Sequence, residues 1–509
     1  MKRFLLAWLL PLGAMLFGQA GSGGYDQPFR PQFHFSPRQH WTNDPNGLVF
    51  FEGEYHLFYQ YNPFGDVWGH MSWGHAVSRD LIHWEELPVA LPEENGVMIF
   101  TGSVVVDSAN SSGFCLGGKP CLVAVWTGFS AKTATKPDLQ TQNIAYSNDR
   151  GRTWTKYRGN PVLNLNLTDF RDPKVFWSGK TKRWVMAVSL PNDHKILIYG
   201  SADLKQWKRL SEFGPAGATG GQWECPELFE LPLDGKTETR WVLKVGLNPG
   251  ALEGGSGEQY FIGRFDGERF QNENPPTTTI WTDYGKDCYC ALTFNNLPKT
   301  DAPVMMGWMS NWQYARDTPT APWRGQMTLP RKLSLRTTPE GIRLFQQPLD
   351  ALATLRGPRM AVRPAMEGTG HQFQFDSTLA VGTAQEVGWK VLAKDGTFTR
   401  IGYDKRKGML FVDRTHSGNV GFSKDFPGRS EAPLNLAGNN LRLNVVVDRD
   451  SVEVFADDGR VTITDLVFAP ADADKLEFYA EGGKASVVSG SFWKLRSAWN
   501  QQAPTAARQ

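Results

Sequence analysis

Two aspartates, Asp44 and Asp172, stand in local settings that suit a carboxylate for catalysis. Each precedes a proline, which restricts the aspartate to extended backbone and so holds its carboxylate in one place. A turn, Asn46-Gly47, follows the first aspartate. Arg171 adjoins the second, and a neighbouring guanidinium keeps a carboxylate ionised. Both aspartates are therefore candidates for a negatively charged catalytic group.

Glu224 is a third candidate with a different role. Its neighbours Trp223 and Cys225 are apolar, and apolar surroundings favour the neutral, proton-donating form of a carboxyl group. Glycoside hydrolysis uses one carboxylate against the anomeric carbon and one carboxylic acid to protonate the leaving oxygen; a third can hold sugar hydroxyls. For any single Asp-Pro the alternative is a structural turn. Three acids at the starts of successive strand runs favour one shared pocket.

The elements that must position these acids are strands. Aromatic residues make up 12% of the 509 positions, with 19 Trp, 52 Gly and 32 Pro, a composition that indicates short strands, tight turns and an all-β protein. A turn motif recurs in which an aspartate after a strand is followed by an aromatic residue. The copies are Asp80 with Trp84, Asp149 with Trp154, Asp203 with Trp207 and Asp266 with Phe270. A spacing of about 55–70 residues predicts a β-propeller of about five blades.

The C-terminal third has a different pattern. From His371 apolar and polar residues alternate, as in residues 372–375 and 452–455, which is typical of half-buried antiparallel strands and predicts one β-sandwich. The predicted division is a five-bladed propeller catalytic domain at residues 30–345, a linker at 346–362, a β-sandwich domain at 363–497 and a tail at 498–509.

The N-terminus predicts export. Met1-Lys2-Arg3 is basic, residues 4–17 are an apolar run, and small residues end at Ala20. This is the pattern of a cleaved secretory signal peptide, here residues 1–20, and the run is too short to span a membrane comfortably. We therefore expect a mature chain that is secreted or periplasmic, with no membrane attachment.

Charge and cysteine content exclude other classes of function. A balance of 54 Lys+Arg against 52 Asp+Glu argues against a nucleic-acid partner. The absence of a CxxC pair, of metal-ligand spacing and of a nucleotide-binding glycine loop leads us to expect no metal and no cofactor. Cys115 and Cys121 flank a turn-rich loop and are candidates for a disulfide in an exported chain. Cys288 and Cys290 share a strand face and are poorly placed to bond each other.

Three motifs resemble the signatures of glycoside hydrolase family 32, which contains invertases, levanases and inulinases. They are residues 41–47, 171–173 and 224–226, and the stretches 68–76, 100–103, 283–287 and 322–327 resemble the family as well. The resemblance implies a five-bladed propeller followed by a C-terminal β-sandwich. It also implies a retaining double displacement on a β-fructofuranoside, with Asp44 as nucleophile, Glu224 as acid/base and Asp172 as transition-state stabiliser. Retention implies carboxyl groups of Asp44 and Glu224 about 5–5.5 Å apart.

The resemblance also suggests which residues contact the substrate. The candidates are Asn43, Gln60, Trp68, Ser103, Arg171 and Trp308, and we expect Tyr284 and Asp287 to line the site. Residues 71–76 and 140–146 resemble exo-acting inulinases and levanases more than invertases. The resemblance thus implies release of terminal fructose from levan or inulin, with sucrose as a side substrate.

Other functions remain open alternatives at this stage. Within the family these are an endo-acting levanase or inulinase and a sucrose-preferring invertase. Outside it, residues 147–154 fit the Asp-box turn of sialidase propellers, and a non-catalytic sugar-binding protein is a third class, which would be favoured if one of the three acids were missing. The sandwich has two interpretations: a brace for the propeller, which we prefer, or a separate fructan-binding module.

Overall fold

The computed structural model describes residues 24–133, 137–298, 301–436 and 438–499. The predicted signal peptide at residues 1–20, and residues 500–509 of the predicted tail, lie outside this description. Within the described residues nearly all regular structure is strand, and the two helices are short 3₁₀ turns, η1 (Pro191–Asp193) and η2 (Asp350–Leu355). None of the described helices is long and apolar enough to cross a membrane.

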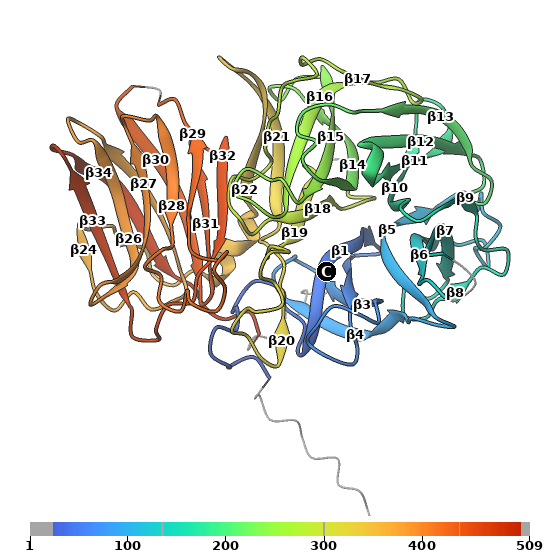
Figure 1. Cartoon of the computed structure of the whole chain (residues 1–509), viewed down its shortest axis with the longest axis horizontal. Coiled ribbons are helices and arrows are strands. Elements are labelled where there is room, and N and C mark those ends of the chain that lie inside the picture. Colours follow the sequence, from blue (N-terminus) through green and yellow to red (C-terminus); the bar gives the residue numbers. More distant parts are fainter. Residues whose placement is uncertain (1–23, 134–136, 299–300, 437, 500–509) are drawn as a thin grey trace, which may run out of the picture.

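Five antiparallel sheets follow one another around a ring and form the blades of a propeller (Figure 1). Blade I holds β1 (His40–Phe51), β2 (Glu54–Tyr61), β3 (Ser72–Ser78) and β4 (Trp84–Leu91). Blade II holds β5 (Val97–Asp107), β6 (Cys121–Ser130), β7 (Leu139–Ser147), β8 (Thr155–Lys156) and β9 (Leu163–Leu167). Blade III holds β10 (Arg171–Ser178), β11 (Arg183–Leu190), β12 (Lys195–Ser201) and β13 (Lys208–Phe213).

The remaining two blades complete the ring. Blade IV holds β14 (Gln222–Pro232), β15 (Thr239–Asn248), β16 (Gly257–Phe265) and β17 (Phe270–Asn272). Blade V holds β18 (Tyr289–Thr293), β19 (Val304–Trp308), β21 (Arg331–Thr338) and β22 (Gly341–Pro348). The connection from β19 to β21 contains β20 (Trp323–Arg324), which pairs in parallel with β1. This pairing joins the last blade to the first and closes the ring.

The repeated Asp turns occupy one structural position. In blades I to IV they join the third strand to the fourth: after β3, β7, β12 and β16. In the third copy, Oδ1 of Asp203 accepts the backbone N–H groups of Lys205 and Gln206 and the hydroxyl of Ser201, so one carboxylate satisfies a whole tight turn. The corresponding turn of blade V, between β21 and β22, has Glu340 instead. The sequence repeat therefore marks the turn between the third and fourth strands of a blade.

The first strands of the five blades form the inner wall of the ring. Each contacts the first strand of the next blade, and β18 contacts β1. Each first strand also has a β-bulge, a point at which some of its residues have no partner in the second strand of the same blade. The bulges lie at Thr42/Pro45 in β1, Ile99/Gly102 in β5, Arg171/Lys174 in β10, Glu224/Glu227 in β14 and Tyr289/Leu292 in β18. A bulge turns a side chain out of the regular alternation.

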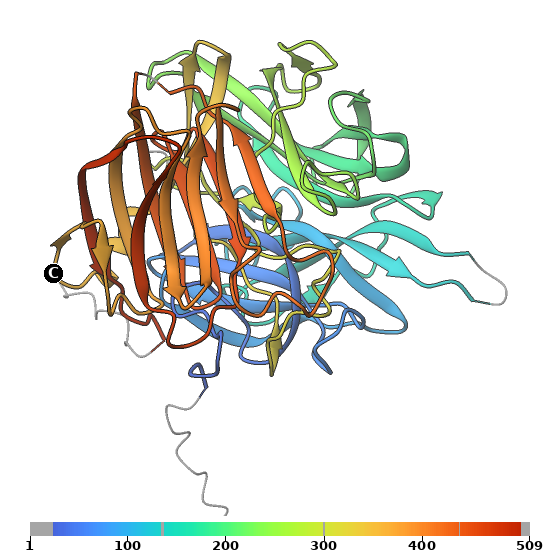
Figure 2. The ribbon, with the colours of Figure 1, turned by 60° about the vertical axis from the view of Figure 1, so that its left-hand side comes forward.

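Two six-stranded sheets form the C-terminal β-sandwich, which packs against one side of the propeller (Figures 1 and 2). One sheet holds β23 (Met360–Ala361), β34 (Ser486–Lys494), β25 (Phe373–Ala380), β30 (Asn440–Asp448), β31 (Ser451–Ala456) and β32 (Val461–Leu466). The other holds β24 (Ala365–Met366), β33 (Lys475–Glu481), β26 (Glu386–Lys394), β27 (Thr397–Asp404), β28 (Met409–Asp413) and β29 (Arg429–Pro433). Buried side chains such as Phe375, Trp389 and Val445 form the core between them.

Buried ion pairs hold the two domains together. Arg331, in β21 of the propeller, pairs with the propeller's Asp283 at 2.8 Å and with Glu453 of β31 at 2.5 Å, and all three side chains are at most 2% exposed. Arg414 of the sandwich pairs with the propeller's Asp287 at 2.6 Å. Dry ionic contacts of this kind fix the relative orientation of the domains, which supports the bracing role of the sandwich.

The Arg331 cluster gives a stability prediction. Replacing Arg331 by alanine removes the counter-charge of the buried Asp283 and leaves Glu453 with His34 as its remaining charged partner, so the free energy of unfolding should fall by about 3–5 kcal/mol. Urea unfolding followed by tryptophan fluorescence measures it. The matched control is Arg336→Ala, at a side chain 41% exposed and 4.0 Å from Asp458, where we expect a change within about 1 kcal/mol. Equal effects of the two variants would contradict the bracing account.

Candidate active site

A pocket of about 380 Å³ opens at the bulged end of the inner strands. Its wall takes residues from the first strands of blades I to IV and from the loop after β19. The lining residues are Asn43, Asp44, Gln60, Trp68, Phe100, Thr101, Phe129, Gln140, Asp169, Arg171, Asp172, Glu224, Asn248, Trp312 and Arg316. The structure thus brings together all three predicted catalytic acids with the predicted contacts Asn43, Gln60, Trp68 and Arg171.

Asp44 stands at the bulge of β1, and its carboxyl group is almost wholly buried. Oδ2 accepts a hydrogen bond of 2.7 Å from Oγ1 of Thr101, whereas the buried Oδ1 has no hydrogen-bond partner within the protein. Burial raises the pKa of Asp44 to about 6; the bond from Thr101 opposes the shift and the charge of Glu224 adds to it. One carboxylate oxygen is therefore held in place while the other is free to react.

Asp172 lies at the bulge of β10 with a φ of 66°. Its backbone is therefore left-handed and not extended as the following proline predicts, because the bulge imposes a conformation that non-glycine residues otherwise avoid. Its Oδ2 accepts the backbone N–H of Cys225 at 2.9 Å, and its own N–H donates to Thr127 Oγ1 at 3.0 Å. Burial raises the pKa of Asp172 to about 7, against the lowering effect of Arg171 and with the charges of Glu224 and Asp44 adding to the rise.

Glu224 follows Trp223 on β14, and its carboxylate is oriented from both sides. Oε1 accepts Nε and Nη2 of Arg171 at 3.0 and 2.9 Å, and Oε2 accepts the Tyr289 hydroxyl at 2.5 Å. Burial and the nearby Glu224 charge raise the pKa of Tyr289 well above its ordinary value, so this hydroxyl keeps its proton and donates. The immediate surroundings of Glu224 are thus polar, in contrast to the apolar setting that its sequence neighbours predict.

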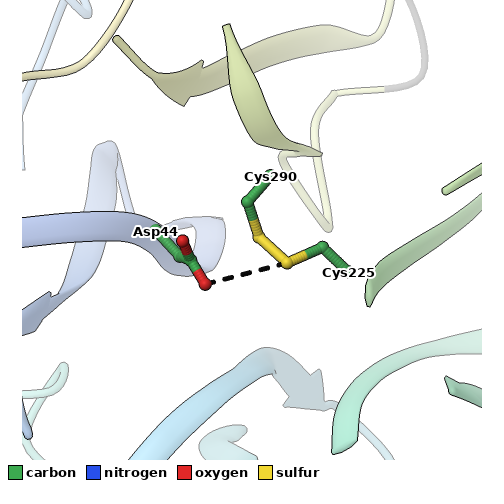
Figure 3. Close-up of side chains that lie close together, drawn as sticks. All are labelled: Asp44, Cys225 and Cys290. Carbon is green, nitrogen blue, oxygen red and sulfur yellow. Dashed lines mark hydrogen bonds between the residues drawn. A yellow bond between two sulfur atoms is a disulfide. The ribbon is translucent and has the colours of Figure 1, made fainter. Parts of the chain in front are cut away.

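A disulfide between Cys225 and Cys290 lies beside the Asp44 carboxyl group (Figure 3). It joins β14 of blade IV to β18 of blade V, and Sγ of Cys225 lies 3.7 Å from Oδ2 of Asp44. A disulfide sulfur carries no proton, so this approach is a contact without hydrogen-bond donation. The three residues cluster as metal ligands could, but the ligand form of cysteine is a thiolate, which a disulfide does not offer.

Aromatic side chains form the outer wall. Trp68 meets Phe100 edge to face with ring centroids 6.1 Å apart, and Phe100 stacks on Phe129 at 4.9 Å. Trp312 forms a further part of the lining. Behind it, Trp308 is fully buried with its centroid 4.8 Å from Trp312. Flat apolar faces of this kind pack against the carbon-bound faces of a sugar ring.

Four predicted contacts lie outside the pocket lining. Ser103 donates to the carbonyl of Pro173 and ties β5 to β10. Trp308 supports Trp312 from behind. Tyr284 and Asp287 face the sandwich, where Tyr284 packs against its core and Asp287 pairs with Arg414. The structure also joins Cys115 to Cys121 by a disulfide, away from the pocket.

Sequence reasoning missed several pocket residues. Thr101, which bonds Asp44, stands in the same motif as the predicted Ser103, about 6–7 Å away along an extended strand, and the bulge at this point of β5 hides which of the two faces the pocket. Tyr289 and the Cys225–Cys290 pair come from chain segments distant in sequence, which only the closed ring brings together. The missed lining residues are Phe100, Phe129, Gln140, Asp169, Asn248, Trp312 and Arg316.

Fold and site together define a class: a propeller whose pocket is lined by Asp44, Asp172 and Glu224, with Asp169 beside them, has the carboxyl groups of a glycoside hydrolase. Comparison with protein-family models identifies the family within this class. Residues 34–348 match the model of the glycosyl hydrolases family 32 N-terminal domain, and residues 334–494 match that of the family 32 C-terminal region. The two matches span most of the chain, which therefore belongs to glycoside hydrolase family 32.

Known proteins resemble the chain along nearly its whole length. A levanase of Bacillus subtilis (strain 168) is 48% identical over 498 residues, covering 94% of this chain and 72% of the levanase. An extracellular exo-inulinase of Aspergillus awamori is 42% identical over 527 residues, covering 96% and 98%. The crystal structure of an Aspergillus awamori exo-inulinase superposes with a TM-score of 0.89 at 41% identity, over 93% of this chain and all of that one.

A further solved structure carries a sugar. The fructofuranosidase of Schwanniomyces occidentalis complexed with fructose superposes with a TM-score of 0.83 at 32% identity, covering 93% of this chain and 99% of that one.

The bond between Thr101 and Asp44 gives a pH prediction. As the predicted nucleophile, Asp44 must be ionised to attack, so we expect kcat/KM to fall as the pH drops through its folded pKa, which is about 6. Thr101→Val removes a donor to the ionised form and raises this pKa, so the acid limb of the profile should move up by about half to one pH unit. The matched control is Thr354→Val in η2, outside the pocket. An acid limb that stays in place or moves down contradicts this assignment.

Proposed function

We propose that this chain is a retaining, exo-acting fructan hydrolase that releases terminal fructose from levan or inulin, with sucrose as a side substrate. The observation that carries the proposal is the convergence of Asp44, Asp172 and Glu224 on one small pocket. Similarity to a levanase and to exo-inulinases along nearly the full chain supports the choice of substrate.

The proposed roles are those that the family resemblance implies, placed on the contacts that the structure gives each acid. Asp44 attacks the anomeric carbon through its unpartnered Oδ1 and forms a fructosyl ester, while Glu224 protonates the leaving oxygen. Glu224 then takes a proton from the water that hydrolyses the ester. Asp172, anchored by the Cys225 N–H, accepts hydroxyl hydrogens of the fructosyl ring and stabilises the developing positive charge. Arg171 holds Glu224 in position before the transfer.

Pocket size supports exo action. A volume of about 380 Å³ lies at the small end of the ~300–1,000 Å³ range of ligand sites. Such a pocket suits the end of a polymer, since an internal stretch of fructan needs room for sugar units on both sides of the cleaved bond. The aromatic wall of Trp68, Phe100 and Phe129 provides the apolar face for the terminal ring.

Export completes the proposal. The basic start, apolar run and small residues before Ala20 form a signal-peptide pattern, and exo-inulinase relatives are described as extracellular. Fructans are polymers too large to enter a cell freely. We therefore propose a secreted or periplasmic enzyme, and the disulfides of the structure fit an oxidising compartment.

The product pattern tests exo action. Incubated with levan or inulin, the protein should release free fructose from the earliest time points while the polymer shortens gradually. Anion-exchange chromatography of timed samples resolves the products, and sucrose run in parallel ranks the side activity. Oligosaccharides that precede free fructose would establish endo action instead, and efficient turnover of sucrose alone would identify an invertase.

The nucleophile has its own test. Asp44→Asn removes the attacking carboxylate, so kcat should fall by about three to six orders of magnitude, while circular dichroism and the unfolding midpoint stay unchanged. The matched control is Asp395→Asn, on an exposed turn of the sandwich, which should keep full activity. NMR of the wild-type reaction should show fructose first released as the β-anomer, as retention requires. Initial release of the α-anomer, or an active Asp44→Asn variant, would remove Asp44 from this role.

A further inference from the structure

Cys225 lies next to all three carboxyl groups of the site. Its Sγ is 3.7 Å from Oδ2 of Asp44, and its backbone N–H donates to Oδ2 of Asp172 at 2.9 Å. Glu224 is the residue before it in the chain. A small displacement of Cys225 therefore moves the surroundings of every catalytic group at once.

The disulfide fixes Cys225 from the neighbouring blade. Its partner Cys290 stands at the bulge of β18 as Cys225 stands at the bulge of β14. The φ angles of Cys225 and Cys290 are 49° and 48° respectively, a left-handed conformation that is unfavourable for a residue with a Cβ. Both are almost fully buried. A covalent link between two bulges in this conformation keeps the inner strands of blades IV and V in register where the pocket is built.

The oxidation state of Cys225 also determines whether its sulfur can donate a hydrogen bond to Asp44. In the disulfide, Sγ has no hydrogen to donate, and the bond to Oδ2 of Asp44 comes from Thr101. A free thiol at the same position would be within reach of Oδ2 as an S–H donor. A second donor would stabilise the ionised carboxylate and thereby lower both its pKa and its nucleophilicity.

We propose that the Cys225–Cys290 disulfide is a positioning element of the active site, which locks the bulges of β14 and β18 together and keeps a proton donor away from the Asp44 carboxylate. The proposal rests on the proposed function, because it takes Asp44 as the nucleophile. It gives a reason for these two cysteines beyond general stabilisation. It also links full activity to the oxidising compartment in which a disulfide forms.

The other titratable groups around Asp44 keep their identity in the test. Glu224 on β14, Asp172 on β10 and Tyr289 on β18 interact with Asp44, and Arg171 lies beside Asp172. None of them is replaced by a substitution at the two cysteines. A shift of the pH profile that appears in a variant with a thiol at position 225, and not in one without it, therefore reports the sulfur.

The experiment compares three variants of the full chain. Cys290→Ala leaves a thiol beside Asp44; Cys225→Ala/Cys290→Ala removes both the link and the donor. Cys115→Ala/Cys121→Ala removes the other disulfide, which joins β6 to the loop before it, and is the matched control. For each, kcat and the pH profile of kcat/KM are measured on levan and inulin, and circular dichroism checks the fold.

We expect Cys290→Ala to lower kcat about tenfold and to move the acid limb of the profile to lower pH by about half a unit. The double variant at 225 and 290 should also lose kcat, but its acid limb should stay at the wild-type position because no donor remains. The control pair should match the wild type in both measurements.

An acid limb that does not move in Cys290→Ala overturns the proposal, whether or not kcat falls, since a merely structural link changes kcat alone. Should that variant fail to fold, Cys225→Ser/Cys290→Ala places a hydroxyl donor at the same position, and the same shift is expected. Alkylation of the unfolded wild type should label Cys288 alone; labelling of Cys225 as well would also overturn the proposal. A wild type without activity on fructans would refute the proposed function instead.

Discussion

The burial of carboxyl groups beside one another is the constraint on which the site depends. Asp44, Asp172 and Glu224 line one pocket, and burial together with the charge of Glu224 raises the cost of ionising the two aspartates. Arg171 offsets part of this cost through two hydrogen bonds to Glu224. Two neutral donors, the Thr101 hydroxyl and the Cys225 N–H, stabilise the carboxylates of Asp44 and Asp172. The acids keep these contacts only if the backbone that carries them stays rigid.

The scaffold supplies that rigidity at several levels. Each inner strand has a bulge where it meets the pocket, so the side chains of Asp44, Asp172 and Glu224 leave the regular alternation of their strands there. The pairing of β20 with β1 closes the ring, and a disulfide links the inner strands of blades IV and V. The sandwich adds buried ion pairs through Arg331 and Arg414 on the outer side.

The sequence predicts the repeating parts of this structure well and the converging parts less well. The all-β class, the five-bladed propeller and the sandwich follow from turn residues, apolar alternation and family motifs, all of which are local signals. The convergence of the three acids on one pocket could also be predicted from local signals, since Asp44 and Asp172 precede prolines and Glu224 stands between Trp223 and Cys225. Tyr289 and the partner of Cys225 could not, because their roles depend on contacts between blades distant in the chain.

Tryptophan illustrates the same limit. Composition gives the number of tryptophans but not their places: Trp41, Trp223 and Trp308 are fully buried, whereas Trp68 and Trp312 line the pocket. The first three therefore pack within the propeller, and we assign the chemistry to the carboxyl groups. Trapping the covalent intermediate tests the role of Asp44 most directly. The Glu224→Gln variant is incubated with a fructoside whose leaving group departs without protonation. The variant should then accumulate one fructosyl unit, which peptide mass spectrometry should locate on Asp44. A fructosyl unit on another residue, or none in a variant that still turns over, would contradict the account.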